Sequence, residues 1–283
     1  MKNCGCCRRP GQAQFFCLIL VLFLAENICQ AQSNQSTGDQ LSYTSLQLKI
    51  LRNDAEIGTA TGFVVAKNNK PYLLTNRHVV LACALDKDPS DVGGWICANK
   101  LKILHNKHGH LGEWFWVVED LFGAQGNKRW FEHPVLGGGA DVVALPLEHS
   151  ENVDFYTFDM ALATADIAVS PGDSVSIVGF PLGLAQEAGL PIWKTGTVAS
   201  DLNTNFGGKP MFLVDTTSRP GMSGSPVYAV RTGAFRNASG QLATAISGRA
   251  TKFLGVYSEQ NQAAEIGGVW KAEIVIALYK SLP

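Results

Sequence analysis

The sequence Arg219-Pro220-Gly221-Met222-Ser223-Gly224-Ser225-Pro226-Val227 places one serine among glycines and prolines, directly before an apolar run. Glycine and proline favour tight turns, so we expect Ser223 to lie in a turn that leads into a strand. Glycine at 221 also permits a close approach of the backbone. The amides of Gly221 and Ser223 are therefore candidate donors to an oxyanion, and one such donor typically stabilises a transition state by roughly 3 to 4 kcal/mol.

Two earlier segments each place a chemically distinctive residue beside a β-rich run. Residues 72–80 are an apolar stretch that leads into His78, and residues 140–145 begin an apolar strand with Asp141. A serine nucleophile needs a base, because its hydroxyl is almost never ionised at neutral pH, and the base needs a carboxylate to hold its tautomer. A histidine with an ordinary pKa of about 6.5 suits the role of base. The sequence therefore predicts a catalytic set of His78, Asp141 and Ser223.

The order of these three residues distinguishes between scaffolds. An α/β-hydrolase has its histidine after the nucleophile. Here the last histidine, His149, precedes Ser223. The order found in subtilisin needs a catalytic aspartate before His78 and an α/β sheet, which the strand-rich pattern does not support. The first scaffold is excluded, and the second is not supported.

The rest of the chain reads as an all-β protein. Short runs rich in Val, Ile, Leu, Thr and aromatic residues recur between Gly, Asn, Asp and Pro, without a helical period, which is typical of an antiparallel sandwich or barrel. The predicted strands are residues 45–51, 58–66, 70–75, 101–105, 113–118, 141–147, 160–164, 174–180, 192–199, 211–216, 225–230 and 251–257.

Few other segments interrupt this pattern. Residues 84–98, 119–128 and 231–248 are predicted as loops, and the last, rich in Gly, Ala, Ser and Thr, as a mobile surface loop. One helix is predicted over residues 270–282, because its apolar residues fall on one side. We expect that side to pack on the body of the protein. Its members are Ile274, Val275, Leu278, Tyr279 and Leu282.

The N-terminus predicts a secretory signal peptide over residues 1–31. Basic residues precede an apolar run over 15–25, which is shorter than the roughly 20 residues of a membrane-spanning helix. Small residues precede an expected cleavage after Ala31. The alternative is an uncleaved anchor or a lipid-attached Cys29. Residues 32–44 are polar and predict a flexible leader, so we expect a secreted or periplasmic protein with no stable membrane association after signal cleavage.

Composition excludes one class of partner. Lys and Arg number 23 against 24 Asp and Glu, for a formal charge of −1, so the totals show no excess of basic residues for a phosphate backbone. We therefore expect no nucleic-acid partner. The 46% hydrophobic content over 283 residues fits one globular domain or two small ones and excludes disorder.

Signal cleavage would leave two cysteines, Cys83 and Cys97. An even pair in an exported chain favours one local disulfide. The alternative is a pair of buried free thiols, and a cysteine nucleophile is less favoured than either, because neither has a catalytic-looking neighbourhood.

A cluster of histidines raises the question of a metal. His105, His108 and His110 are closely spaced, as imidazoles that share an ion can be. No cysteine or acidic residue completes a ligand pattern, and Lys102 and Lys107 add positive charge. We expect a solvated hairpin here, with no metal and no other cofactor.

The three segments together resemble the signature blocks of chymotrypsin-like serine proteases. Within that clan they are most similar to the bacterial branch of HtrA-type and glutamyl-endopeptidase-type enzymes, and residues 173–183 resemble the strand and turn that HtrA-type domains carry between the aspartate and serine blocks. The resemblance covers about residues 45–280. It implies a double six-stranded antiparallel β-barrel with a C-terminal α-helix, with barrels over about 45–150 and 151–283. The active site would lie between them.

The same resemblance implies a serine endopeptidase that acts on proteins or peptides through an acyl-enzyme. Two departures matter. HtrA-type enzymes usually append a peptide-binding PDZ module, for which the residues after Glu259 leave no room, so we expect none. Digestive members have an acid before the nucleophile to receive a new N-terminus, whereas Met222 stands here. We therefore expect no activation through that ion pair.

The resemblance also suggests a substrate pocket. Its base would lie at Thr217 and one wall on the strand with Tyr257 and Ser258, which favours a small or medium apolar side chain before the scissile bond. Asp215 is the one acid that would favour Lys or Arg there. Glutamate is an alternative, since the Ser-Gly-Ser-Pro ending and Arg219 resemble glutamyl enzymes, although those have a histidine where Tyr257 stands. A catalytically inactive peptide-binding relative is the other alternative. The oligomeric state stays open.

Overall fold

The structure is a computed structural model that describes residues 39–85, 95–149, 151–217, 219–261 and 263–283. One compact unit runs from Gln40 to Pro283. The predicted signal peptide, its cleavage after Ala31 and most of the predicted leader lie outside the described residues. No helix in the described ranges is both long and apolar enough to cross a membrane.

The first half of this unit is an antiparallel sheet of eight strands, in the order β10-β6-β1-β2-β3-β9-β8 with β7 paired to β6. It contains two strands more than the expected six, because the two-residue strands β8 and β10 extend the ends of the path. The strands are β1 (Ser45–Arg52), β2 (Ala55–Lys67), β3 (Lys70–Thr75), β6 (Lys100–Lys107), β7 (Trp114–Asp120), β8 (Phe131–Glu132), β9 (Val143–Pro146) and β10 (Val153–Asp154).

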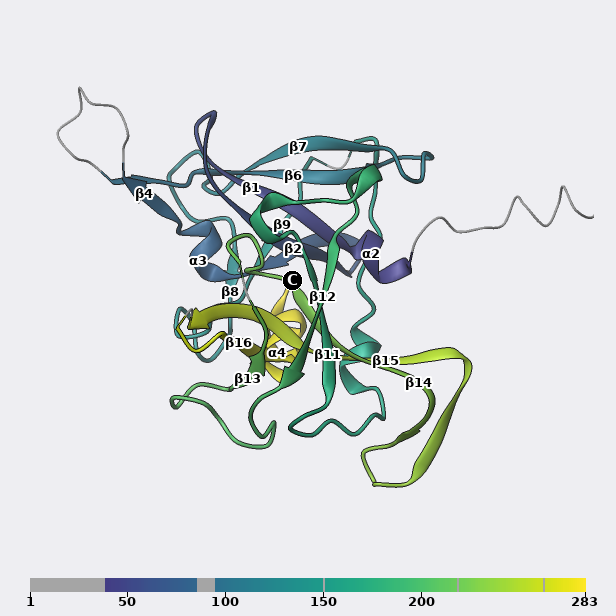
Figure 1. The fold of residues 1–283 in the computed structure, drawn as a ribbon. Coiled ribbons are helices and arrows are strands. Elements are labelled where there is room, and N and C mark those ends of the chain that lie inside the picture. Colours follow the sequence, from purple (N-terminus) through teal and green to yellow (C-terminus); the bar gives the residue numbers. More distant parts are fainter. Residues whose placement is uncertain (1–38, 86–94, 150, 218, 262) are drawn as a thin grey trace, which may run out of the picture. The chain divides into compact units, whose positions relative to one another are not determined.

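The second half is a closed barrel of six strands, in the order β11-β12-β13-β16-β15-β14. Figure 1 shows it below the first sheet. Together the two halves confirm the predicted chymotrypsin-like double-barrel fold. The strands are β11 (Ser174–Gly179), β12 (Ile192–Val198), β13 (Met211–Asp215), β14 (Pro226–Arg236), β15 (Leu242–Asn261) and β16 (Ile266–Lys271). The predicted division between the halves at residue 150 stays a prediction.

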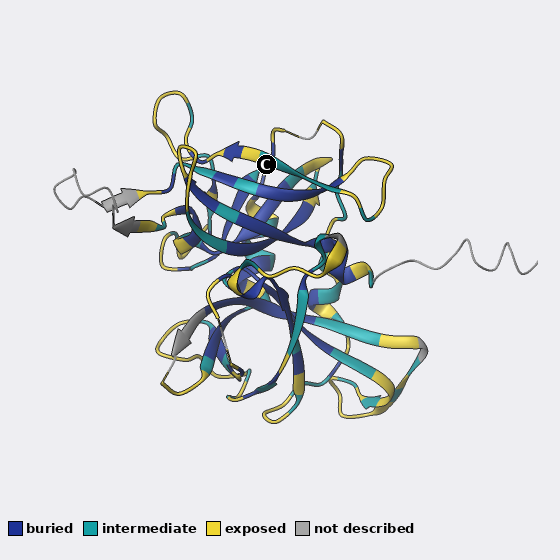
Figure 2. Ribbon diagram, turned by 45° about the horizontal axis from the view of Figure 1, so that its top comes forward, coloured by how far each residue is buried: buried dark blue, intermediate teal, exposed yellow. Residues whose placement is uncertain are grey.

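Side-chain alternation along the strands creates three cores. In β2, Val64 faces a core inside the first sheet, whereas Phe63 and Val65 face the opposite way. This follows from the two-residue period of a strand. The opposite face joins a shared core with Tyr228 and Trp270 of the second barrel. The barrel interior forms a third core. Figure 2 shows the buried residues gathered on the inner faces of both sheets.

The C-terminal helix α4 (Ala272–Ser281) confirms the predicted helix and packs into the shared core. It begins two residues later than expected, because Trp270 and Lys271 belong to β16. Lys67 at the end of β2 donates from Nζ to the carbonyls of Tyr279 (3.0 Å) and Lys280 (2.6 Å), at the helix C-terminus. The last turn of α4 is therefore tied to the first half of the molecule.

Three sequence expectations were wrong. Residues 160–164, predicted as a strand, form the 3₁₀ helix η1 (Met160–Thr164), which begins where Asp159 accepts a hydrogen bond from the Ala161 amide. Residues 231–248, predicted as a mobile loop, mostly belong to a long hairpin of β14 and β15, paired from Arg231 to Arg236. Its small and polar residues suit an exposed two-stranded ribbon as well as a loop. Strands were also missed: β8, β10 and β16 were not anticipated, and the predicted loop over 84–98 contains strand residues at both ends.

The predicted leader also needs correction at its end. Gln40–Thr44 form the short helix α2, and Leu41, Ser42, Tyr43 and Thr44 are buried. Ser42 Oγ accepts a hydrogen bond from Trp193 Nε1 of β12 at 2.8 Å. These residues are therefore part of the folded body.

The predicted disulfide between Cys83 and Cys97 is present. It joins β4 (Cys83–Leu85) to β5 (Trp95–Cys97), which pair as a separate two-stranded sheet. The pair β4–β5 follows the helix α3 (Arg77–Val80), which contains His78. The disulfide therefore links the two strands of the hairpin that comes directly after this helix.

Candidate active site

His78 and Asp141 are brought together by two adjacent strands. Strands β3 and β9 pair antiparallel with Thr75 opposite Val143, so the residues just beyond Thr75 and just before Val143 meet at one edge. The Nδ1 atom of His78 lies 2.7 Å from Asp141 Oδ2, and the His78 amide donates to Asp141 Oδ1 at 2.8 Å. One carboxylate thus contacts both the ring and the backbone of the histidine.

Asp141 has further partners that hold it as an ion. The Ser258 hydroxyl donates to Oδ2, and the Asn76 side-chain amide donates to the Asp141 carbonyl at 2.7 Å. Burial alone would raise the pKa of Asp141, but the hydrogen bonds from His78 and Ser258 outweigh it, and the pKa lies below its usual value. The carboxylate therefore stays charged at neutral pH.

Ser223 lies in the tight turn that its glycines and prolines predicted. The Ser225 amide donates to the Met222 carbonyl at 3.0 Å, and the Gly224 amide donates to the Tyr257 carbonyl at 2.9 Å. The Ser223 hydroxyl points at the carbonyl of Ser258, at 3.5 Å. Ser258 therefore contacts both parts of the site, Asp141 through its hydroxyl and Ser223 through its main chain.

The third contact of the predicted catalytic set is not formed. No hydrogen bond joins Ser223 to His78 in the described part of the chain. Catalytic hydrogen bonds are often long or poorly aligned without substrate, so the ground-state geometry leaves the role of Ser223 open. The structure brings together His78, Asp141 and Ser258 by direct bonds, and Ser223 through Ser258.

The backbone of the turn presents two free donors. Gly221 has a φ of +94°, which favours glycine, and a side chain there would collide with the Phe180 carbonyl. Within the described ranges, neither the Gly221 amide nor the Ser223 amide donates to a protein acceptor. Two N–H groups of one turn without acceptors suit the binding of an oxyanion.

The residues predicted to form a substrate pocket have different surroundings. Thr217 is exposed on the loop after β13. The Tyr257 side chain is buried in the core of the second barrel, and its ring fills the space beside Gly267. The Ser258 hydroxyl is committed to Asp141. Their role in substrate recognition stays a prediction, and the contact between Ser258 and Asp141 is a site feature that the sequence analysis missed.

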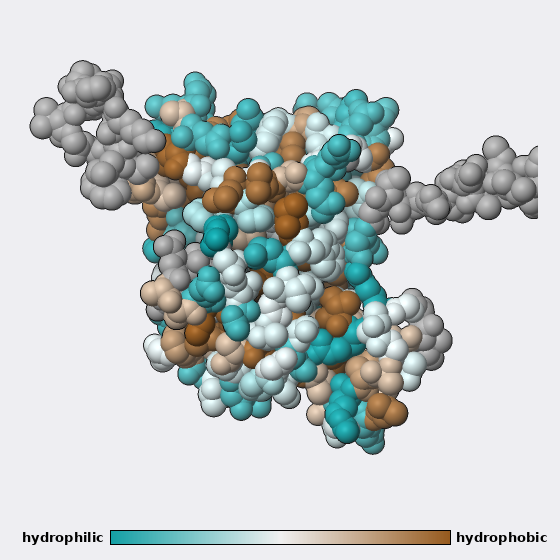
Figure 3. Space-filling view, in the orientation of Figure 1, coloured by the Kyte–Doolittle hydropathy of each residue, from teal (hydrophilic) through white to brown (hydrophobic). Residues whose placement is uncertain are grey.

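Exposed apolar side chains lie in two segments that are close to predicted site residues along the chain or through a hydrogen bond. Val135 and Leu136 lie in the loop that precedes Asp141, and Leu182 and Leu184 follow β11. The Leu182 amide donates to the Pro220 carbonyl at 2.6 Å, so this turn lies against the segment of Ser223. On the face in Figure 3, apolar side chains occur in small groups between polar ones. Such groups offer apolar contacts to a bound chain.

The three histidines considered as metal ligands are not arranged as a cluster. His105 is buried in β6, whereas His108 and His110 are exposed and lie beside Asp154 and Glu113 respectively. No group of three or more His, Cys, Asp or Glu side chains among the described residues is placed to hold a metal ion.

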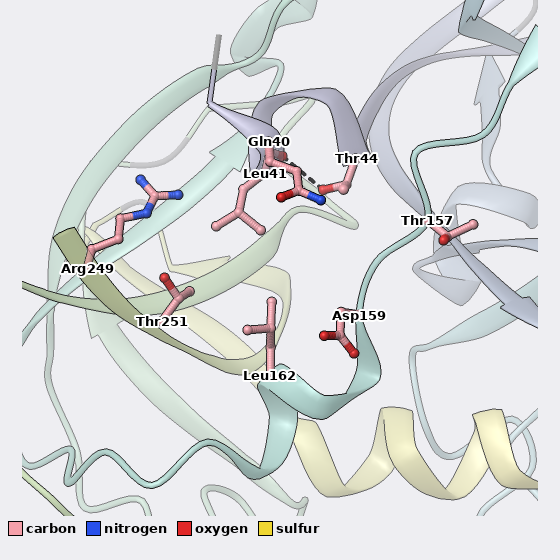
Figure 4. Close-up of a pocket in the computed structure, with 8 residues that line it drawn as sticks. All are labelled: Gln40, Leu41, Thr44, Thr157, Asp159, Leu162, Arg249 and Thr251. Carbon is pink, nitrogen blue, oxygen red and sulfur yellow. Dashed lines mark hydrogen bonds between the residues drawn. The ribbon is translucent and has the colours of Figure 1, made fainter. Parts of the chain in front are cut away.

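A recess of about 300 Å³ lies away from His78, between α2, η1 and the base of the long hairpin. Figure 4 shows Arg249 and Asp159 on opposite sides of it, with Leu41 and Leu162 between them. It contains none of the predicted site residues. Its other lining residues are Gln40, Thr44, Thr157 and Thr251.

Comparison with known proteins gives one family match. A family model described as a trypsin-like peptidase domain matches residues 60–235, which is more than half of the chain and includes His78, Asp141 and Ser223. No curated protein sequence matches the chain.

Solved structures with a similar arrangement include two named proteases. The serine endoprotease from Yersinia pestis shares 14% identity at a TM-score of 0.46, over 86% of this chain and 66% of its own. The HtrA-type protease AlgW, with a tripeptide, shares 14% identity at a TM-score of 0.48, over 85% of this chain and 60% of its own. The chain thus spans less than two thirds of the length of these structures.

Proposed function

The chain belongs to the trypsin-like peptidase family, and we propose that it is an active serine endopeptidase that hydrolyses peptide bonds through an acyl-enzyme on Ser223. His78 would act as general base and then general acid, and Asp141 as the carboxylate that orients it. The observation that carries the proposal is the double contact of Asp141 with the ring and amide of His78, with Ser258 linking that pair to Ser223.

The protonation states of Asp141 and the His78 ring support these roles. An ionised Asp141 accepts the hydrogen on His78 Nδ1, which leaves Nε2 as an acceptor. The Ser223 hydroxyl turns from the Ser258 carbonyl toward Nε2 as substrate enters. Its oxygen attacks the scissile carbonyl while its proton passes to Nε2. His78 then gives this proton to the leaving amine, and a water activated in the same way releases the acyl group.

The developing negative charge has donors in place. The amides of Gly221 and Ser223 lack other acceptors within the described chain, so they can both donate to the carbonyl oxygen as it becomes an oxyanion. Donors that are free before substrate binds do not have to break another hydrogen bond during the reaction.

We also propose that the protease cleaves after a small or medium apolar residue. Thr217, Tyr257 and Ser258 carry no charge to pair with a buried Lys, Arg or Glu, and an unpaired buried charge costs several kcal/mol. The exposed leucines beside the turn fit an apolar substrate chain. Cleavage of a peptide library tests this: preferred cutting after Lys, Arg or Glu would contradict it.

A second candidate function has one observation in its favour. Because the Ser223 hydroxyl faces the Ser258 carbonyl instead of His78, the same site would suit a relative that binds peptides without cleaving them. Labelling with a fluorophosphonate probe decides between the two. A peptidase gives an adduct on Ser223 that is lost in Ser223→Ala and strongly reduced in His78→Ala, whereas a binding protein stays unlabelled although folded.

Secretion to an oxidising compartment belongs to the same proposal. The disulfide between Cys83 and Cys97 is compatible with it, since such bonds persist outside the cytosol. N-terminal sequencing of the exported protein tests the expected start after Ala31, and mass-based thiol counting tests the bond. A free pair of thiols in the exported protein would contradict this part of the proposal.

A further inference from the structure

Thr61 lies in β2 of the first sheet, yet its contacts reach the turn that carries Ser223 in the second half. Its side chain is fully buried. The hydroxyl donates to the Gly221 carbonyl at 2.8 Å and accepts from the Phe180 amide at 3.1 Å. The Thr61 amide donates to the Ser223 carbonyl at 2.8 Å. Thr61 thus binds the carbonyls of Gly221 and Ser223, the two residues whose amides are free.

A second contact completes the hold on Gly221. The Pro220 carbonyl accepts from the Leu182 amide at 2.6 Å. Leu182 has a φ of +56°, a left-handed conformation that is uncommon for leucine and persists only where the surroundings impose it. Because a peptide unit is planar, fixing the Pro220 carbonyl also fixes the direction of the Gly221 N–H. Both carbonyls that flank Gly221 are therefore anchored.

The neighbouring glycines make room for this arrangement. A side-chain carbon at Gly179 would lie 2.8 Å from the Thr61 hydroxyl, and one at Gly224 would collide with the Thr61 carbonyl. The Thr61 carbonyl also accepts from Thr75 Oγ1 at 2.8 Å. Thr61 is thus held in place on its own sheet while two segments of the other half close around it.

We propose that Thr61 is a positioning residue that holds the Gly221–Ser223 amides in the geometry that binds an oxyanion. This inference rests on the proposed peptidase function. Thr61 has no contact with the reacting atoms and acts through Gly221 and Ser223. Without its hydroxyl, the Gly221 carbonyl and the Phe180 amide lose a buried partner, and the peptide after Gly221 is held among the described residues only by the 3.3 Å bond from the Met222 amide to the Arg219 carbonyl.

The kinetic test compares Thr61→Val, which removes the hydroxyl at nearly constant shape, with Thr61→Ser, which retains it. We expect kcat to fall roughly 10- to 100-fold in T61V, somewhat less than the loss of a whole oxyanion donor. KM should stay within about twofold, since the transition state is affected more than substrate binding. T61S should recover most of kcat.

A matched control separates positioning from stability. Thr44 is also buried and donates one hydrogen bond, to the Leu41 carbonyl at 2.9 Å, but lies in α2. Thr44→Val should lower the unfolding temperature without lowering kcat. An unchanged kcat in T61V, or a T61S variant as slow as T61V, would overturn the proposal. Thr61→Ala provides a second variant without the hydroxyl if T61V does not fold.

A second readout does not depend on activity. Hydrogen exchange at the Met222 amide, which donates to the Arg219 carbonyl and shares a peptide plane with the Gly221 carbonyl, should be faster in T61V than in the wild type, T61S or Thr44→Val. Unchanged exchange in T61V would overturn the inference even if the wild type is active. Conversely, a wild type that neither hydrolyses peptides nor reacts with a fluorophosphonate refutes the proposed peptidase function, and the exchange experiment still measures the hold of Thr61 on the turn.

Discussion

Asp141 makes more hydrogen bonds within the site than any other predicted site residue. It accepts from the ring and amide of His78 and from the Ser258 hydroxyl, and its own carbonyl accepts from Asn76. The donors from His78 and Ser258 favour the charged form of the carboxylate over the protonated form. The contact with the ring fixes which nitrogen of His78 carries its hydrogen, so the chemistry of the histidine depends on the acid beside it.

Asp141→Asn tests that dependence. The amide has nearly the same shape, but its NH₂ group favours the wrong tautomer of His78, so we expect kcat to fall by roughly 10³- to 10⁴-fold with little change in KM. Steady-state hydrolysis of a peptide substrate measures this. Ser258→Ala, which removes one donor and leaves the carboxylate, should lose far less. A D141N variant with near-normal kcat would contradict the role given to Asp141.

His105 makes stability depend on pH. Its side chain is buried, its Nε2 has no hydrogen-bond partner among the described residues, and burial lowers its pKa to about 4. The unfolded chain, with a histidine pKa of about 6.5, binds a proton that the folded chain excludes. The contribution of His105 to stability is therefore complete above pH of about 6.5 and is lost as pH falls toward about 4.

We expect this effect to reach roughly 3 kcal/mol in the free energy of unfolding. Urea unfolding at several pH values between 4 and 7 measures it, and the His105→Gln variant is the comparison because Gln does not titrate. Other groups titrate in both proteins, so the difference between the two curves carries the result. Parallel curves would show that His105 is not the cause.

At the scale of elements, most strands were predictable and the exceptions have physical causes. The runs at 45–51, 70–75 and 174–180 have the composition and length of strands and are found as such. Residues 160–164 are equally apolar, but five such residues fit a strand or one helical turn, and the cap from Asp159 favours the turn. The composition of a short apolar run therefore does not distinguish a strand from a helical turn.

The site was predictable to the extent that its chemistry is local. His78, Asp141 and the turn at Ser223 each have a distinctive neighbourhood in the sequence. The contributions of Ser258 and Thr61 have none, because each is a contact between a strand residue of one half and a loop or turn residue of the other. No pattern of residue types along one segment contains such a contact.

The junction of β2 and α4 gives a prediction at this scale. Lys67 donates to the Tyr279 and Lys280 carbonyls, and the Tyr279 hydroxyl donates to the Ala66 carbonyl at 3.0 Å. A cation at a helix C-terminus satisfies free carbonyls and opposes the helix dipole. Lys67→Gln should therefore destabilise the protein by about 1 kcal/mol, measured by urea unfolding.

The control for that change is close by. Lys70 is paired with Lys67 across the β2–β3 turn and is exposed. Lys70→Gln removes the same charge without touching α4 and should leave stability within about 0.5 kcal/mol of the wild type. Equal losses in both variants would mean that net charge, and not the contact with the helix, causes the effect.

At the scale of the whole molecule, the two halves share one core and exchange hydrogen bonds at several places. Phe63 and Tyr72 of the first sheet pack with Phe253 and Trp270 of the second barrel. The helix α4 packs into this core. At the site, Thr61 of the first sheet hydrogen-bonds to Gly221 of the second half. Because the site is assembled from both halves, any change that loosens their junction is expected to affect catalysis as well as stability.

The N-terminal segment is part of that junction, which bears on how the enzyme becomes active. Met222, which replaces the acid that receives a new N-terminus in digestive relatives, is buried in the core of the second barrel. α2 already packs on the body, with Ser42 bonded to Trp193. A cut within the folded segment after Gln40 should therefore weaken the protein and should not activate it.

Two shortened chains test this expectation. A chain that begins at Gln40 keeps α2 and should match the full mature protein in kcat and in stability. A chain that begins at Ser45 loses the buried side chains of Leu41 and Tyr43 and should be destabilised by roughly 3 to 5 kcal/mol in urea unfolding. Peptide hydrolysis by the uncut protein completes the test: activity that appears only after cleavage between residues 40 and 60 would show that a new N-terminus is needed after all, and Met222 would then have to move to admit it.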